Sequence, residues 1–238
     1  MTRLDPYKHR ADRYDEWFER NKHAYRSELR AMRALLPQNG DGLEVGVGTG
    51  RFAAPLGIAL GLDPSRAMMA KARSRRVAVV EGIAESLPFG HARFDQVLMV
   101  TVVFLLEDPD AAFREARRVL KPGGALVVGF VDKNSDLGAV YDRRKDESSF
   151  YGGARLLSPE DMSTLLMGAG FRDLAFVQTL FRLPEDLDAE DPVEAGYGRG
   201  SFVVVRGQRG HLQKGESTVG NRKSMIVVEH GQIGKVGG

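Results

Sequence analysis

The chain alternates short apolar runs with amphipathic or charged stretches, and this pattern predicts strands that alternate with helices. Five apolar runs, at about 43–47, 58–63, 77–80, 94–102 and 125–131, have the length and composition of buried strands. The run at 94–102 is apolar on both faces, as expected for a central strand of a parallel sheet. The pattern therefore predicts an α/β fold in which helices cover both faces of a doubly wound, mostly parallel sheet.

Two more strands are predicted near the end of the chain, at 173–181 and 201–206. An acidic loop with Pro184 and Pro192 joins them, and no helical pattern lies between them. Strands joined without a crossover helix pair antiparallel. The expected fold is thus a Rossmann-like, seven-stranded sheet whose last strand is antiparallel.

Helix boundaries are marked by local signals. Residues 5–36 have an amphipathic helical pattern, and Asp63-Pro64-Ser65 and Asp108-Pro109 are typical helix starts. Ser158 and Asp161 have the spacing of a reciprocal cap at the start of another helix. The pattern breaks in the charged segment 132–157, and residues 208–238 are rich in Gly, Lys and Ser, which indicates a flexible tail.

Composition narrows the possible functions. The 238 residues include no cysteine, which excludes disulfides and thiolate chemistry, and the five histidines have no metal-ligand spacing, so no metal is expected. The net charge of +2 indicates no nucleic-acid partner. The charged N-terminus and the lack of a long apolar run indicate no leader peptide and no membrane span, so a cytoplasmic protein is expected.

The most specific motif is a glycine turn directly after the first predicted strand. Gly46, Gly48 and Gly50 allow a tight turn and close approach of a ligand, and Glu44 precedes them. The dinucleotide fingerprint needs its third glycine where this chain has Arg51, which disfavours an NAD-dependent oxidoreductase. Asp63 ends the second strand, where a carboxylate can accept both ribose hydroxyls. Glu44, just before the turn, suits a ligand whose end near the loop carries a cation. A ligand with a ribose at one end and an ammonium or sulfonium at the other is S-adenosylmethionine.

Six motifs in order resemble the class I S-adenosylmethionine-dependent methyltransferases, especially the group similar to ubiquinone/menaquinone-biosynthesis methyltransferases (methyltransferase type 11 domain). They span about residues 7–206 and lie at 43–50, 62–65, 82–89, 94–95, 107–109 and 118–124. The resemblance implies an enzyme with S-adenosylmethionine as its cofactor. It also implies a cap over the cofactor at 1–36, a methyltransferase domain at 37–207, a substrate-side insertion at 132–157 and a tail at 208–238.

The resemblance also implies roles for single residues of the cofactor site. Glu44 and the backbone of Gly46, Gly48 and Gly50 would hold the methionine end, and Asp63 with Pro64 would hold the ribose. Ile83 and Ala84 would border the adenine, Thr101 would face the transferring methyl, and a helix with Tyr14 and Trp17 would cover the cofactor. Apart from the resemblance, the acceptor is expected to be lined by Trp17, Phe104, Tyr141, Tyr151 and Arg155; the alternative is that the aromatic residues of 132–157 only dock this segment onto the core.

Two departures from the family bear on the chemistry. Ile83 stands where relatives often have an aspartate for the adenine amino group, and 103–106 lacks the histidine that many relatives carry. No catalytic residue is therefore assigned, and a mechanism driven by proximity is expected, with nitrogen in a small molecule as the favoured acceptor over oxygen or carbon. The alternative is a non-catalytic protein that binds S-adenosylmethionine or has a regulatory role. The oligomeric state and the acceptor stay open.

Overall fold

The computed structural model describes residues 11–144 and 155–210, and all structural statements concern these residues. The strands are β1 Gly42–Val45, β2 Leu60–Asp63, β3 Ala78–Glu81, β4 Phe94–Val100, β5 Leu120–Val131, β6 Phe171–Thr179, β7 Glu194–Ala195 and β8 Phe202–Arg209. The helices are α2 Ala11–Arg20, α3 Lys22–Leu35, α4 Ala53–Leu56, α5 Arg66–Ser74, α6 Pro109–Val119, α7 Asp136–Arg144 and α8 Pro159–Gly168. Short 3-10 helices lie at Val103–Leu105 and Pro184–Asp186.

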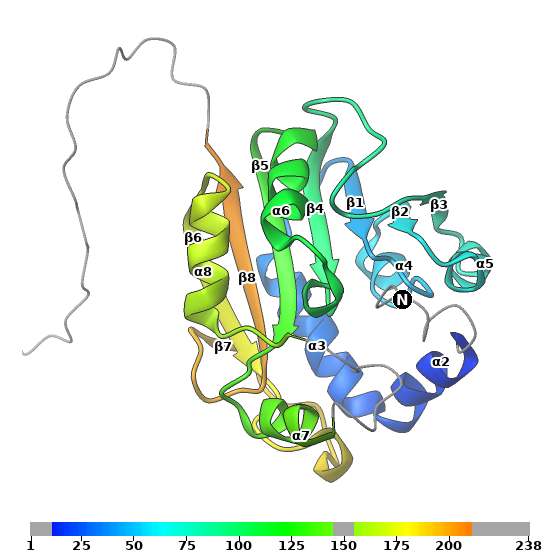
Figure 1. Cartoon of the computed structure of the whole chain (residues 1–238). Helices are drawn as coiled ribbons and strands as arrows, with labels where there is room; N and C mark the ends of the chain where they lie inside the picture. Colours follow the sequence, from blue (N-terminus) through cyan, green and yellow to red (C-terminus); the bar gives the residue numbers. More distant parts are fainter. Residues whose placement is uncertain (1–10, 145–154, 211–238) are drawn as a thin grey trace, which may run out of the picture.

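The strands form a single sheet in the order β3-β2-β1-β4-β5-β8-β6-β7 (Figure 1). Strands β1 to β5 pair parallel, and β8 pairs antiparallel with both β5 and β6. The expected doubly wound, mostly parallel fold is confirmed, and so is the antiparallel pairing of the last two long strands. The described sheet has eight strands, because the acidic loop adds the two-residue strand β7 at the edge.

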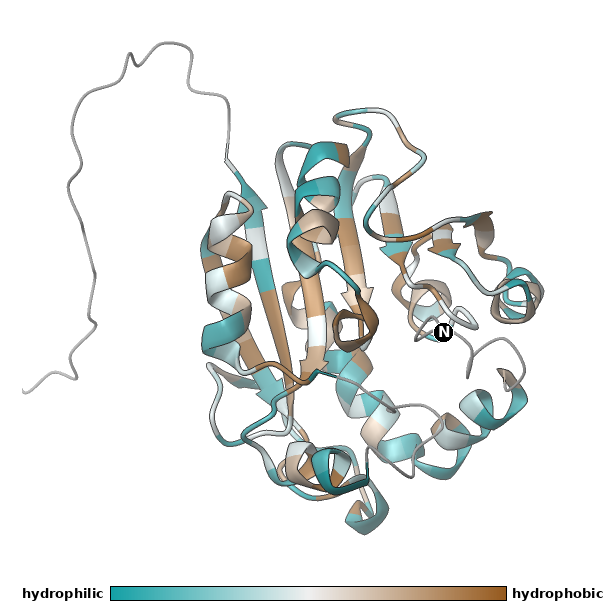
Figure 2. Ribbon diagram, in the orientation of Figure 1, coloured by the Kyte–Doolittle hydropathy of each residue, from teal (hydrophilic) through white to brown (hydrophobic). Residues whose placement is uncertain are grey.

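Each face of the sheet carries its own core. Val97, Met99 and Val128 point to the face that α6 and α8 cover, whereas Leu98 and Val127 point to the face that α3 covers. Because neighbouring strand residues alternate between faces, a strand buried on both sides must be apolar throughout. Figure 2 shows this as apolar central strands flanked by helices whose outer surfaces are hydrophilic.

The predicted helix starts are confirmed at three places. The Ser65 side chain accepts a hydrogen bond from the Met68 N–H, and Asp108 accepts one from the Ala111 N–H. Ser158 and Asp161 form the expected reciprocal capping box. Each cap satisfies an N–H group that the helix itself cannot pair, and so fixes where the helix begins.

The N-terminal helical segment is not the continuous helix that the pattern predicts. Asn21 leaves the helical conformation (φ −108°, ψ 46°), and its side chain donates to the Trp17 carbonyl at 2.9 Å. An asparagine side chain that bonds to nearby backbone competes with the helix ladder. The break separates α2 from α3 and lets them run in different directions around the pocket described below (Figure 1).

The segment at 132–157 contains a helix that the sequence pattern did not reveal. Asp132 accepts a hydrogen bond from the Asn134 N–H at 2.9 Å, and Ser135 Oγ accepts one from the Gly138 N–H at 3.0 Å. A Cβ at Gly138 would lie 2.2 Å from the Asp132 carbonyl oxygen, so only glycine permits this tight entry into α7.

Within the described part of the chain, no helix has the length and apolar composition needed to cross a bilayer. Of the predicted 208–238 tail, only the first residues belong to the described range, where they continue β8.

Candidate active site

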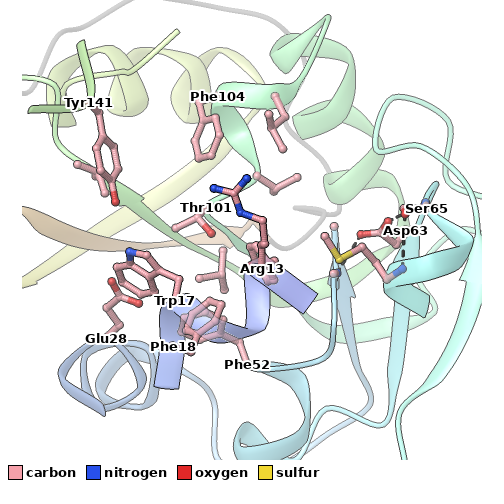
Figure 3. Close-up of a pocket in the computed structure, with 18 of the residues that line it drawn as sticks. Arg13, Trp17, Phe18, Glu28, Phe52, Asp63, Ser65, Thr101, Phe104 and Tyr141 are labelled. Atoms are coloured by element: carbon pink, nitrogen blue, oxygen red, sulfur yellow. Dashed lines mark hydrogen bonds between the residues drawn. The ribbon is translucent and has the colours of Figure 1, made fainter. Parts of the chain in front are cut away.

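A pocket of about 290 Å³ lies where the carboxyl ends of the parallel strands meet helices α2, α3 and α7. In open α/β sheets this edge is the usual place for ligands. Figure 3 shows side chains that converge on the pocket from the strand ends and from the N-terminal helices. The pocket therefore lies where the sequence motifs predicted a nucleotide site.

The glycine turn after β1 has the backbone conformation that only glycine adopts easily. The φ angles of Gly46, Gly48 and Gly50 are +74°, +53° and +79°. A Cβ at Gly46 would lie 2.4 Å from a methyl carbon of Val102, in the segment after β4. Gly46 and Gly48 line the pocket, whereas Gly50 packs beneath it against α5.

Asp63 ends β2 and lines the pocket, with its carboxylate fixed by backbone groups. Its two oxygens accept hydrogen bonds from the Gly48 N–H at 2.9 Å and the Ser65 N–H at 2.8 Å. Burial raises the pKa of Asp63, and these two hydrogen bonds oppose the rise. Each oxygen keeps a second lone pair, so the carboxylate can still accept two hydroxyls of a ribose.

Glu44 is buried beside the glycine turn but does not line the pocket. Strand alternation places its side chain on the face covered by α3 and α4, and burial raises its pKa well above the usual value. Its Oε2 atom has no hydrogen-bond partner among the described residues.

Asp15 joins α2 to the glycine turn and to α5. Its carboxylate accepts hydrogen bonds from Thr49 Oγ1 at 2.7 Å, Arg51 Nε at 3.0 Å and Arg75 Nη2 at 2.8 Å, and Lys71 Nζ lies at 3.3 Å. Burial alone would raise the pKa of Asp15, but the hydrogen bonds from Arg75, Thr49 and Arg51 outweigh it and lower the pKa to about 2. This network fixes the helix that carries Tyr14 and Trp17 into the pocket.

Thr101 follows β4 and lines the pocket in a strained conformation. Its φ is +49°, which is rare for a β-branched residue, and its N–H donates to the Gly129 carbonyl at 2.8 Å. Such strain costs on the order of 1–3 kcal/mol and persists where the surrounding structure enforces it, often at functional sites. Figure 3 shows Thr101 in the middle of the pocket, between Asp63 and Trp17.

Glu28 is a pocket residue that the sequence motifs did not reveal. It lies on α3 and lines the end of the pocket that also contains Trp17 and Tyr141 (Figure 3). Burial raises its pKa from 4.5 to about 8. The available signal was helical spacing, because Ala24, Ser27, Glu28 and Ala31 form one buried stripe.

The structure brings most of the predicted site residues together. Those that line the pocket are Tyr14, Trp17, Gly46, Gly48, Asp63, Pro64, Thr101, Phe104 and Tyr141. Ile83 and Ala84 lie after β3, outside the pocket lining, with Ile83 exposed and Ala84 buried in the core under α6. Arg155 is exposed and does not line the pocket, although the neighbouring Leu156 does. Tyr151 lies outside the described residues.

Comparison with known proteins identifies the class. A family model described as a methyltransferase domain matches residues 43–128. The crystal structure of an S-adenosylmethionine-dependent methyltransferase from Thermotoga maritima, named a "possible histamine N-methyltransferase", is 46% identical. It aligns with a TM-score of 0.85 over 87% of this chain and 99% of that chain.

Two curated relatives extend the comparison. An uncharacterized protein of Methanocaldococcus jannaschii is 40% identical over 211 residues, which cover 88% of this chain and all of the relative. A demethylmenaquinone methyltransferase of Roseiflexus sp. is 36% identical over 103 residues, covering 39% of this chain and 43% of the relative.

The chain belongs to the S-adenosylmethionine-dependent methyltransferases, as the motifs predicted. It is therefore an enzyme of the class I, Rossmann-like group, and its cofactor is S-adenosylmethionine. The residues around the glycine turn fit this cofactor, because Gly46 and Gly48 give backbone access and Asp63 offers free lone pairs.

Proposed function

We propose that this enzyme methylates a small molecule, with nitrogen as the favoured accepting atom. The observation that carries the proposal is a pocket with two chemically different ends. Asp63 and the glycine turn form one end, and Trp17, Phe104 and Tyr141 contribute aromatic side chains to the rest. The first end suits the ribose and methionine of the cofactor, and the second suits a compact, partly apolar acceptor.

The elements around the pocket have matching roles in this proposal. Helix α2, within the expected cap at 1–36, closes over the cofactor, and α7, within the expected insertion at 132–157, covers the acceptor end. Asp15 supports the first role, because its hydrogen bonds to Thr49 and Arg75 tie α2 to the cofactor loop. Tyr141 supports the second, because it extends from α7 into the pocket (Figure 3).

Nitrogen is favoured because of the loop after β4. Residues 101–106 contain no titratable side chain, and Thr101 alone among them is polar. A phenol or carbon acid must lose a proton to a base beside the reacting atom, whereas an amine in its neutral form has a lone pair and needs no base in this loop. The name of the Thermotoga maritima neighbour also points to an amine acceptor. Bound S-adenosylmethionine supplies an electrophilic methyl group on sulfur, and the protein holds the acceptor in line and excludes water.

A screen for S-adenosylhomocysteine release tests the proposal. Purified protein with S-adenosylmethionine is offered small amines, including histamine, together with phenols and quinone precursors. The proposal expects several turnovers with at least one amine, which would also exclude a purely regulatory role. Product formation only from phenols or quinone precursors would overturn the preference for nitrogen, and release from none of the acceptors would overturn methyl transfer to a small molecule.

A further inference from the structure

Glu28 is a buried carboxyl that lines the pocket and finds no partner among the residues that the structure describes. The residue is 4% exposed and lies on the buried stripe of α3, and its side chain is among those that line the pocket. No hydrogen bond or ion pair of the Glu28 side chain is found within residues 11–144 and 155–210. Asp15, on the preceding helix, has four such donors.

A carboxyl in this setting is costly unless a ligand pairs with it. Burying an ionised carboxylate without a partner costs several kcal/mol, so buried charges are normally paired. The neighbouring stripe residues Ala24 and Ala31 have no side-chain donor, and the Ser27 hydroxyl donates to the His23 carbonyl instead. Folding alone gives no reason for an acid here, because an apolar residue of similar size would bury without this cost.

The surroundings of Glu28 favour a cation. Figure 3 shows the Trp17 indole beside Glu28, with the Tyr141 ring on the far side of the indole. Aromatic faces attract ammonium groups, and the attraction is stronger in a desolvated site. The titratable and charged groups that line the same pocket or lie beside Glu28 are Arg13, Tyr14 and Arg20 of α2, Tyr25 of α3, Asp63 of β2 and Tyr141 of α7.

We propose that Glu28 binds the methyl acceptor, and that the acceptor is a small amine whose nitrogen lies against this carboxyl and the rings of Trp17 and Tyr141. The inference rests on the proposed function and names its substrate class. Glu28 lies at the end of the pocket away from Asp63, so it acts on the acceptor and leaves the ribose contact to Asp63 (Figure 3).

The same carboxyl prepares the nitrogen for reaction. An amine arrives at neutral pH as an ammonium ion, whose nitrogen has no lone pair. Near and above pH 8, where Glu28 is ionised, its carboxylate accepts one proton: an N–H bond breaks, its electron pair stays on nitrogen, and an O–H bond forms on Glu28. The pair of charges becomes a neutral amine and a neutral carboxylic acid. The pKa of about 8 that burial gives Glu28 is close enough to that of an amine to allow this exchange.

Binding to the protein loaded with S-adenosylhomocysteine gives the first test. The probes are 2-phenylethylamine and tyramine, each with the alcohol in which hydroxyl replaces the amino group. We expect at least one amine to bind at least tenfold tighter than its alcohol, and the Glu28→Gln variant to lose that preference. The control is the Glu16→Gln variant, which replaces an exposed carboxyl on α2 outside the pocket. This variant should keep the preference for the amine. Equal binding of amine and alcohol, or a preference that persists in Glu28→Gln, would overturn the inference.

A pH series with (2-phenylethyl)trimethylammonium gives the second test and needs only the unmodified enzyme. This ion has no acidic proton, so its affinity follows the charge on the protein alone. Because the carboxyl ionises near pH 8, affinity should rise at least tenfold between pH 6 and pH 9. The rise should vanish in Glu28→Gln, and a flat series in the unmodified enzyme would refute the role of Glu28.

The outcome separates this inference from the proposed function. S-adenosylmethionine affinity is measured on the same samples and should be unchanged by Glu28→Gln. Methyl transfer to phenols without any preference for amines would leave a small-molecule methyltransferase and remove the amine-binding role of Glu28. Absence of transfer to every acceptor, together with ammonium binding that depends on Glu28, would overturn the proposed function and keep the binding site.

Discussion

Two buried carboxyls on neighbouring helices, Asp15 on α2 and Glu28 on α3, have opposite surroundings. Asp15 accepts hydrogen bonds from Thr49, Arg51, Arg75 and Lys71, which lower its pKa to about 2 against the effect of burial. Glu28 has no described partner, and burial raises its pKa to about 8. A carboxyl whose hydrogen bonds are complete holds elements together. A carboxyl that lines a pocket without partners, such as Glu28, lowers the stability of the fold, and its presence is explained by binding of a ligand.

The largest expected effect is on Glu28 and depends on pH. Because its folded-state pKa is raised, its contribution to stability is fully present below pH 4.5 and is lost as pH rises towards 8. Glu28→Gln removes this loss, so at pH 9 the variant should be more stable by on the order of 4 kcal/mol. Urea unfolding at pH 4.5 and pH 9 measures the difference, and equal stability of the two proteins at pH 9 would contradict the burial of an unpaired carboxyl.

The opposite change is expected at Asp15. Asp15→Asn leaves Arg51 and Arg75 without their shared carboxylate and should destabilise the protein by about 3 kcal/mol. The matched control is Asp12→Asn, which removes a solvent-exposed ion pair with Lys71 and should cost less than about 1 kcal/mol. Urea unfolding at pH 7 compares the two, and similar costs would show that the Asp15 network does not hold α2.

The fall in folding stability at acidic pH distinguishes the two carboxyls further. The depressed pKa of Asp15 means that its stabilisation is present above about pH 3.8 and is lost as pH falls towards 2. The shift corresponds to about 2 kcal/mol. Asp15→Asn should flatten the fall in stability between these pH values, whereas Glu28→Gln should leave it unchanged.

The smallest expected effect concerns backbone strain in the pocket. Thr101→Gly relieves the positive φ and should stabilise the fold by about 1 kcal/mol while it lowers the rate of methyl transfer. Ala92→Gly is the control, because Ala92 has a φ of +53° in an exposed turn away from the pocket. It should stabilise to a similar extent and leave the rate unchanged. Thermal unfolding and turnover rates measure both, and full activity in Thr101→Gly would remove any role of that side chain.

The cofactor end of the pocket could be predicted from the sequence because its requirements are local. The glycine turn needs positive φ angles at alternate residues, and a carboxylate must end the next strand, so Gly46, Gly48 and Asp63 stand at fixed spacing. Glu44 was expected at the same end, but strand alternation turns its side chain away from the pocket lining.

The acceptor end could not be predicted in the same way because it is assembled from distant segments. The buried stripe of α3 also contains Ala24, Ser27, Ala31 and Met32, and its helical spacing shows that Glu28 faces inward but not that it lines a pocket. Helix α7 carries charges, and Gly138 permits its tight entry close to the Asp132 carbonyl oxygen, which the hydrophobic pattern does not mark. Tyr141 was expected to line the acceptor site, and it does extend from α7 into the pocket.

The affinity for S-adenosylmethionine of Asp63→Ala and Glu28→Gln, measured side by side by calorimetry, tests the two-ended pocket most directly. Asp63→Ala removes hydrogen bonds between a charged group and the ribose, worth on the order of 3 kcal/mol, and should weaken binding about hundredfold. Glu28→Gln should change the affinity less than about twofold, because its carboxyl serves the acceptor. Cofactor binding that is lost in Glu28→Gln and retained in Asp63→Ala would contradict this account of the site.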